Sequence, residues 1–404
     1  MAGTRTEETG RGQAHLGITV PMLLVLGALS AVPPLSFDMY LPALPQVADS
    51  LGVPEAQIQL TLSACLLGLA FGQLFGGPIS DSLGRRRPLL VGVGGYAVAS
   101  LACAFAPTAS ALVVLRFAQG LLGGVAVVIA RAIVRDREEG AAAARVFSLL
   151  MLVSGIAPIA APLFGGLLIS ITSWRGIFVT LSLIGAAGLL AVTVILPETL
   201  APENRHAGGI GETLAVAKRV LRHRPLLGYA FTAAFSSGAL FFYISCSSFV
   251  FQDIYGLTSA EYSLVFAVNA VALMGVGWLN ANLVRRHEPA VLLRWGVWQA
   301  LVGAAVLCAV LWLDLGLPAV LPALLLTVAS LPFIVPNATA LALAPYSREA
   351  GSVSALLGVL QFAVGAIASP LASVAGEVTA FSMAFGMLIM GMLALVTRRV
   401  LVPT

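Results

Sequence analysis

Long apolar segments follow one another along the whole chain and are separated by short polar stretches. Each apolar segment has about 20 residues, the length that a helix needs to cross a bilayer core about 30 Å thick. The pattern predicts an all-α polytopic membrane protein with twelve transmembrane helices. The expected helices cover residues 18–45, 56–79, 88–106, 109–131, 146–169, 176–196, 226–251, 263–284, 292–313, 318–343, 352–375 and 379–397.

The longest polar stretch, residues 197–225, divides the expected helices into two sets of six. The loop after the second helix reads GPISDSLGRRRP, and a degenerate copy, GWLNANLVRRHEP, follows the eighth. Two related halves are typical of transporters that bind substrate between pseudo-symmetric bundles and alternate their access. We therefore expect a disordered cytoplasmic tail at 1–15, a six-helix bundle at 16–196, a cytoplasmic central loop at 197–225 and a second bundle at 226–400.

Basic residues lie almost entirely on one side of the expected membrane. Of the 22 lysines and arginines, the outer loops hold Arg175 alone when the chain is counted from an inner N-terminus. Positive residues favour the cytoplasmic side, so both termini are expected there. With 59% hydrophobic and 10% charged residues, the chain is too apolar for a soluble protein. The net charge of +4 follows from this topology, and no nucleic-acid partner is expected.

Asp38 and Arg116 are the two ionisable residues set well inside expected helices. A charge at this depth costs a few kcal/mol, so it needs a partner or a task. At 1.5 Å of rise per residue both lie about 10 Å below the outer surface, which makes an ion pair between the two helices feasible. We expect Asp38 to carry a proton and Arg116 to tune it electrostatically. A permanent structural ion pair is the alternative.

The loop after the second helix combines a carboxylate with glycines and arginines: Gly77, Asp81, Gly84, Arg85 and Arg86. Asp81 ends one helix and is placed to face the positive N-terminus of another. A charge contact that forms in one state and breaks in the other would act as a conformational lock. Positive-inside topology explains the arginines, but neither Asp81 nor the glycines.

A second basic run, from Arg131 to Arg135 and Asp136, lies near the inner end of the fourth expected helix. We interpret it as ion pairing at a cytoplasmic gate, with membrane topology as an equal alternative.

Polar side chains within the expected helices are few, and aromatic residues cluster in the seventh. An apolar cavity with sparse hydrogen-bonding groups suits amphipathic, drug-like molecules, whereas a sugar would need a partner for each hydroxyl. The chain shows neither a metal-binding cluster within the helices nor a GxSxG nucleophile motif, so we expect no metal site and no enzyme. The candidate cavity residues are Tyr40, Gln73, Gln119, Phe235, Phe241, Phe242, Tyr243, Asn269, Asn337 and Gln361.

Several of these motifs carry a family resemblance. GPISDSLGRRR (77–87) resembles the signature loop of the major facilitator superfamily, and LVVLRFAQGLLGG (112–124) is similar to its fourth-helix motif. APLFGG (161–166) resembles the fifth-helix antiporter motif through Pro162, Gly165 and Gly166. Five further segments together resemble the twelve-helix drug:proton antiporters of the bicyclomycin- and chloramphenicol-resistance (Bcr/CflA-like) branch. They are DMYLPALP, RAIVRD, WRGIF, LPETL and AGSVSALLGVLQF.

The resemblance covers essentially the whole chain. It implies a carrier of the bacterial cytoplasmic membrane that exports phenicol- or bicyclomycin-like drugs, is driven by the proton gradient and needs no cofactor. A carrier with twelve spans can work as a monomer, and we expect a monomer here. Two departures weaken particular parts: Ser82 stands where the signature loop usually has arginine, and Ala157 and Ala161 replace glycines of the antiporter motif. A metabolite importer or facilitator on the same fold remains the alternative.

Overall fold

The computed structural model describes residues 17–138, 140–205, 223–346, 350–371 and 379–402, and within these ranges it contains helices and no strand. We call residues 17–205 the first half and residues 223–402 the second half. The first half contains α1 (Val20–Ser30), α2 (Val32–Asp38), η1 (Leu41–Ala43), α3 (Leu44–Leu51), α4 (Glu55–Leu83), α5 (Arg86–Ala104), α6 (Ala109–Arg137), α7 (Gly140–Ile171), α8 (Trp174–Ile195) and η2 (Pro202–Asn204). The second half contains α10 (Arg224–Phe249), η3 (Val250–Ile254), α11 (Ser259–Leu283), α12 (Pro289–Trp312), α13 (Leu317–Val328), α14 (Leu331–Leu343), α15 (Ala350–Leu371) and α16 (Ala380–Leu401).

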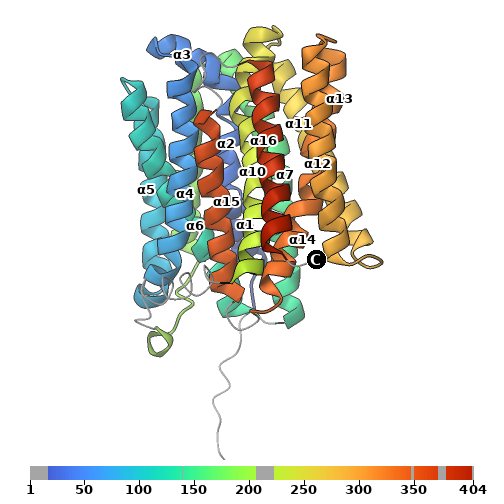
Figure 1. Cartoon of the computed structure of the whole chain (residues 1–404). Coiled ribbons are helices and arrows are strands. Elements are labelled where there is room, and N and C mark those ends of the chain that lie inside the picture. The colour runs from blue at the N-terminus through green and yellow to red at the C-terminus, as the bar shows by residue number, and fades with distance from the viewer. Residues whose placement is uncertain (1–16, 139, 206–222, 347–349, 372–378, 403–404) are drawn as a thin grey trace, which may run out of the picture.

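The described helices form one bundle of long, roughly parallel rods, with α4, α5 and α6 on one side and α11, α12 and α13 on the other (Figure 1). Eleven helical segments are long and apolar enough to cross a membrane, and the apolar part of α15, Leu356–Leu371, is a shorter twelfth. The predicted all-α polytopic fold is confirmed. The expected tail at 1–15 and residues 206–222 of the central loop lie outside the described residues, so the domain boundaries stay a prediction.

Prolines break the first membrane segment into pieces. Pro33 and Pro34 have no N–H, so the carbonyls of Leu29 and Ser30 receive no helical hydrogen bond from them, and α1 gives way to α2 at Ala31. The Ser30 carbonyl instead lies 3.5 Å from the Ser154 hydroxyl of α7. The break opens backbone polar groups to a neighbouring helix.

Glycines bring α4 and α6 into backbone contact. A Cβ atom on Gly68 or Gly72 would collide with the carbonyls of Phe117 or Leu121 on α6, and one on Gly124 would collide with α4 in return. Helices packed in lipid approach this closely only where side chains are absent. The two helices therefore pack backbone to backbone within the first half.

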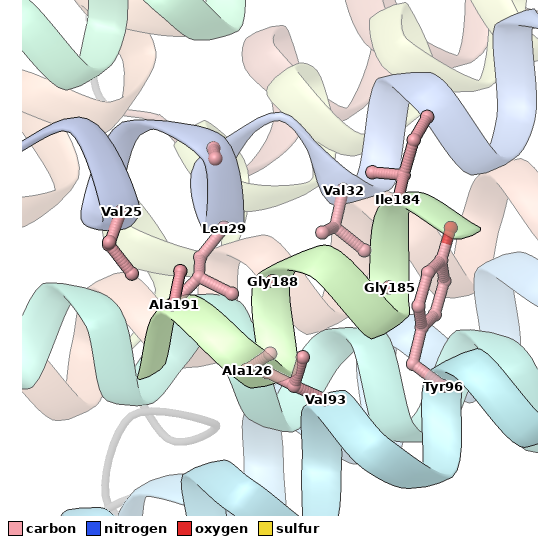
Figure 2. A pocket seen from close by; sticks show the side chains of 11 residues that line it. Val25, Leu29, Val32, Val93, Tyr96, Ala126, Ile184, Gly185, Gly188 and Ala191 are labelled. Carbon is pink, nitrogen blue, oxygen red and sulfur yellow. The ribbon is translucent and has the colours of Figure 1, made fainter. Parts of the chain in front are cut away.

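A small apolar pocket of about 50 Å³ lies beside the break between α1 and α2 (Figure 2). Leu29 and Val32 face Tyr96 of α5 across it, and Gly185 and Gly188 of α8 form its floor. Drug-sized ligands need several hundred Å³, so this pocket is a packing gap and not a substrate site.

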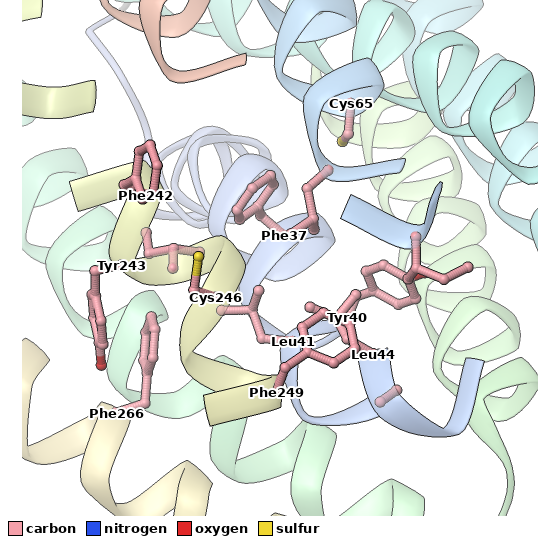
Figure 3. Packing of buried hydrophobic residues seen from close by; sticks show 14 of the residues in the cluster. Phe37, Tyr40, Leu41, Leu44, Cys65, Phe242, Tyr243, Cys246, Phe249 and Phe266 are labelled. Atoms are coloured by element: carbon pink, nitrogen blue, oxygen red, sulfur yellow. The ribbon is translucent and has the colours of Figure 1, made fainter. Parts of the chain in front are cut away.

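The two ends of the bundle differ in how the halves meet. We call the end that carries the α4–α5 and α11–α12 junctions and the last turns of α6 and α16 the arginine-rich end. Toward the opposite end, one apolar core contains residues of both halves, including Phe37 and Leu41 against Phe242 and Phe249 (Figure 3). The remaining apolar clusters each lie within a single half. The halves therefore pack together at the end opposite the arginines.

Candidate functional site

A cavity of about 780 Å³ lies between the two halves. Pockets for small organic ligands commonly have 300–1,000 Å³, so a drug-sized molecule fits this volume. The wall is mainly apolar and is built from both halves. Its lining residues are Ser30, Pro33, Pro34, Phe37, Asp38, Leu66, Leu69, Gln73, Val127, Val128, Arg131, Arg135, Phe147, Met151, Ser154, Pro158, Leu240, Phe241, Tyr243, Ile244, Phe266, Asn269, Ala270, Leu273, Val328, Val335, Thr339, Leu357, Gly358, Gln361 and Phe362.

Hydrogen bonds between the halves close the cavity at the end opposite the arginines. The Ser248 hydroxyl donates to the Leu41 carbonyl at 2.6 Å, and the Gln252 amide donates to the Pro42 carbonyl at 3.1 Å. Pro45 has no N–H to offer the Leu41 carbonyl, which leaves room for the serine. Gln252 lies in η3, a π-helical turn of a kind often found at functional sites.

Asp38 is the last residue of α2 and lies on the cavity wall, 6% exposed. Among the described residues its carboxylate has no hydrogen bond, and no arginine nitrogen lies within 4.0 Å of it. The ion pair with Arg116 that the matched depth made feasible is therefore not formed in the described structure. The reason is helical phase: Ser36, which contacts Arg116, precedes Asp38 by two residues, and two residues turn a helix by about 200°.

Arg116 is fully buried on α6, away from the cavity. Its Nη1 donates to the Ser36 carbonyl at 2.9 Å and to Gln119 Oε1 at 2.6 Å. The guanidinium lies 4.9 Å from the ring centroid of Tyr40 and 5.6 Å from that of Phe178. Its Nε and Nη2 have no partner within the described part of the chain. Carbonyl dipoles and aromatic faces, and not a carboxylate, surround this cation.

Five candidate cavity residues line the cavity: Gln73, Phe241, Tyr243, Asn269 and Gln361. Two polar pairs order this wall, since the Asn269 amide donates to the Tyr243 hydroxyl at 3.0 Å and the Ser237 hydroxyl donates to Gln361 at 3.2 Å.

The other five candidates do not line the cavity, and their expected place there is corrected. Tyr40 and Gln119 belong to the Arg116 surroundings, where Gln119 also donates to Ser100 at 2.7 Å. Phe242 is buried against Gly386, and Phe235 stacks on Phe231.

Asn337, the last of these five, donates to Asn280 and to the Phe333 carbonyl, both at 2.8 Å. Composition identifies a side chain as polar or aromatic, but the rotational phase of its helix decides whether it meets the cavity.

Arg131 and Arg135 line the cavity, which the sequence interpretation missed by assigning them to gate ion pairing. Asp136, expected to pair with them, instead pairs with Arg85. The spacing of four residues was the available signal, because residues four apart share a helix face.

Charged groups of the expected lock form a network at the arginine-rich end. The Arg85 guanidinium pairs with Asp81, donates to Asp136 at 2.8 Å and also reaches Ser80 at 2.8 Å. Burial opposes the charge of Arg85, but its bonds to Asp136 and Asp81 raise its pKa overall. All these groups belong to the first half. The partner of Asp81 is the guanidinium of Arg85, which is the N-cap residue of α5.

Glu198 completes the network and was not among the predicted site residues. Its carboxylate accepts the backbone N–H groups of Arg85 at 2.8 Å and Arg86 at 3.2 Å, together with those of Thr199 and Leu200. Partial burial raises the pKa of Glu198, but these four N–H donors outweigh it and leave the pKa below its usual value. The carboxylate thus caps the N-terminus of α5.

The two glycines of the expected lock have different surroundings. Gly84 has a φ of 88° and stands so close to Glu198 that a side chain would collide with the carboxylate, so both its backbone and its space require glycine. At Gly77 a Cβ would meet only Val128, at 3.9 Å, and the Gly77 carbonyl accepts the Ser80 hydroxyl at 2.8 Å.

The residues of the expected antiporter motif lie on α7 at the closed end. Gly165 faces the Met39 carbonyl, and a Cβ on Gly166 would collide with Ser263 of α11. Pro162 lies within the helix, one turn before Gly166. The motif therefore lets α7 approach both the first membrane segment, at Met39, and α11 of the second half.

Comparisons with known proteins agree with this architecture. The family model described as Major Facilitator Superfamily matches residues 26–370. The chain is 36% identical over 377 residues to an uncharacterized MFS-type transporter, YdgK, of Bacillus subtilis, covering 93% of this chain and 92% of that protein. It is 34% identical over 369 residues to a bicyclomycin resistance protein homolog of Haemophilus influenzae, covering 91% and 93%.

Solved structures show the same fold at low sequence identity. The xylose transporter XylE from E. coli, in a partially occluded inward-open conformation, matches with a TM-score of 0.71 at 13% identity and covers 94% of this chain and 96% of that chain. A bacterial homolog of the human lysosomal transporter Spinster matches with a TM-score of 0.72 at 14% identity, covering 93% and 94%. On these matches and this architecture, the chain belongs to the Major Facilitator Superfamily and is a multi-pass membrane transporter, not an enzyme.

Proposed function

We propose that this transporter exports amphipathic, drug-like small molecules in exchange for protons. The observation that carries the proposal is Asp38, a carboxylate without a cationic partner within 4.0 Å on the wall of a drug-sized, mainly apolar cavity. Relatives support the cargo class, since one is named a bicyclomycin resistance protein homolog and another the multidrug resistance protein MdtL of Klebsiella pneumoniae, 32% identical over 377 residues.

The cavity wall favours amphipathic cargo over sugars. Phe241, Phe266 and Phe362 offer aromatic surface, while Gln73 and Asn269 are among the few uncharged polar side chains on the wall. A sugar would leave several hydroxyls without partners there, at about 1–3 kcal/mol for each buried unsatisfied group. A phenicol-like molecule, with an aromatic ring, has fewer such groups for its apolar surface.

Asp38 is proposed to load and release the coupling proton. An ionised carboxylate without a paired cation is costly to enclose, so closing the cavity around it favours proton uptake and opening the cavity to water favours release. Arg116 donates to the Ser36 carbonyl, two residues before Asp38, and so holds the turn that presents the carboxylate. In this proposal Arg116 acts through α2 and not as a direct ion-pair partner.

The bilayer orientation follows from the arginines. Positive residues favour the cytoplasm, so the arginine-rich end faces inward and both termini are cytoplasmic, in a bacterial cytoplasmic membrane. The cavity then reaches the cytoplasm near Arg135, and the bonds from Ser248 and Gln252 close it to the outside. Alternating access requires these bonds to break while the halves close around the arginine-rich end. We propose that a monomer suffices and that no cofactor takes part.

A metabolite importer or facilitator on the same fold is the second candidate. The two are separated by loading proteoliposomes with drug and dissipating the proton gradient with an uncoupler. Uphill drug movement that stops on uncoupling supports antiport. Equilibration at an unchanged rate, without uphill movement before uncoupling, would support the facilitator and reject the proposal.

A further inference from the structure

Two guanidinium groups line the cavity close to its arginine-rich end. Arg131 and Arg135 lie four residues apart on α6, on the same face of the helix, and both are exposed to the cavity. Arg131 lies six residues before the end of α6 at Arg137, about 9 Å of helix inside that end. Its charge therefore belongs to the cavity wall and not to a loop.

Neither guanidinium has a carboxylate partner among the described residues. The nearest acidic residue in sequence, Asp136, is bonded to Arg85 and to the Thr199 hydroxyl. Like charges four residues apart on a helix repel each other and destabilise it. The positive-inside rule does not require arginines on the cavity wall, because arginines in the loops, such as Arg285 and Arg286, are sufficient to orient the chain in the membrane.

Charge along the cavity is unevenly placed. Arg116 contacts α2 at Ser36, two residues before Asp38, and Arg131 follows Arg116 by fifteen residues, or about 22 Å of helix. Asp38 is the only carboxylate among the described residues that line the cavity, and it thus lies near the closed end, while the two guanidiniums lie toward the arginine-rich end. The aromatic side chains of Phe147 and Phe241 contribute apolar surface to the same wall.

We infer that Arg131 and Arg135 form a binding site for the acidic group of cargo, so that organic anions and zwitterions of drug size are preferred over uncharged analogues. Guanidinium groups bind carboxylates through two parallel hydrogen bonds, which adds directional selectivity to charge attraction. The anionic group would lie on the arginines, and the apolar body would lie against the aromatic wall. This inference deepens the proposed drug export and rests on it.

The test compares an acid with its neutral isostere. Binding of dansylglycine and of dansylglycinamide is measured by fluorescence on the purified full chain at pH 7.5. The protein is held in nanodiscs of phosphatidylcholine, so that no anionic lipid headgroup competes, and partition into empty nanodiscs is subtracted. The variants are Arg131→Gln, Arg135→Gln and, as a matched control, Arg286→Gln, which removes an exposed arginine outside the cavity.

The wild type is expected to bind the acid at least about 10-fold more tightly than the amide. Arg131→Gln should abolish this preference and leave the affinity for the amide within about twofold, while Arg286→Gln should match the wild type. Equal binding of acid and amide by the wild type, a preserved preference in Arg131→Gln, or no saturable binding of either probe would each overturn the inference.

If Arg131→Gln does not purify as a monodisperse protein, Arg135→Gln decides. It is expected to lower the acid preference at least about threefold, and an unchanged preference would reject the site. The binding assay needs no gradient. If the wild type shows proton-coupled export but no preference for the acid over the amide, this inference alone is rejected. If the wild type prefers the acid but its drug transport does not depend on the proton gradient, the proposed function alone is rejected.

Discussion

Replacing Asp38 with asparagine distinguishes an unpaired carboxylate from a permanent ion pair. Asparagine keeps the shape of the side chain and removes its charge. In the structure Asp38 has no hydrogen bond and no cation within 4.0 Å among the described residues, so the substitution removes no direct contact. We expect Asp38→Asn to change the free energy of unfolding by less than about 1 kcal/mol, or to stabilise the protein.

If Asp38 were part of a buried ion pair, Asp38→Asn would lower the free energy of unfolding by much more. Removing one partner of a buried pair costs about 3–5 kcal/mol, because the remaining charge is left buried and uncompensated. Arg116→Gln should be destabilising by itself, since it loses the charged bonds to Ser36 and Gln119, each worth about 1.5–3 kcal/mol. In a double-mutant cycle, the coupling between the two substitutions should stay below about 1 kcal/mol.

The chain supplies its own unfolding probes for this measurement. Cys65, Cys103 and Cys246 are buried, so their reaction with a fluorogenic maleimide reports unfolding during a titration with sodium dodecyl sulfate. Wild type, both single variants and the double variant are compared at pH 7.5. A loss of about 3 kcal/mol or more in Asp38→Asn, with a coupling of similar size, would refute the assignment of Asp38 as unpaired.

Three further outcomes are expected. Ser248→Ala removes the hydrogen bond to the Leu41 carbonyl and should shift the conformational equilibrium by about 1–3 kcal/mol toward states that are open at the end opposite the arginines. Distances between spin labels placed across that end measure the shift, and unchanged distances would contradict the closing role of Ser248. Gly72→Ala should lower the free energy of unfolding by at least about 1–3 kcal/mol because its Cβ would collide with α6. Gly188→Ala is the control, because its Cβ would meet only Val93 at 3.5 Å, and its free energy of unfolding should stay close to wild type. Equal effects of the two substitutions would contradict the backbone contact between α4 and α6. Because the pKa of Glu198 is lowered by folding, the folded protein binds a proton at this carboxylate less readily than the unfolded protein does. The ionised carboxylate therefore contributes its full stabilisation above the pKa of the unfolded state, near 4.3, and this contribution is lost as the pH falls through the folded-state pKa. The stability difference between wild type and Glu198→Gln should therefore be constant from pH 6 to 8 and shrink below about pH 4.5, and a difference that grows in acid would contradict the capping role.

Hydrophobic pattern was sufficient for the fold. Apolar runs of bilayer length predicted twelve spans, and the structure supplies eleven long ones and the shorter Leu356–Leu371. Pro33 and Pro34 break the first span because proline has no backbone N–H to donate. These features depend on one segment at a time, so they can be read from local sequence.

Contacts between helices were predictable only in part. The residue count along each helix places Asp38 and Arg116 at a similar depth in the membrane, and Arg116 does contact Ser36, two residues before Asp38. The count does not give the rotation of α2 about its axis, and this rotation turns the Asp38 side chain away from Arg116. Helix rotation also decides that Phe241 faces the cavity while Phe242, the next residue, is buried away from it, and the sequence alone does not give this rotation. Glu198 was missed because its partners, the amides of Arg85 and Arg86, lie more than a hundred residues away.

Asp38 is proposed to carry the proton that is exchanged for cargo. The most direct measurement is cargo-triggered proton release from energised everted vesicles, with a panel including phenicols and bicyclomycin, for wild type beside Asp38→Asn at equal expression. We expect the wild type to release protons when cargo is added, and the variant to give no response while remaining folded. An equal response in both proteins would show that Asp38 does not carry the proton.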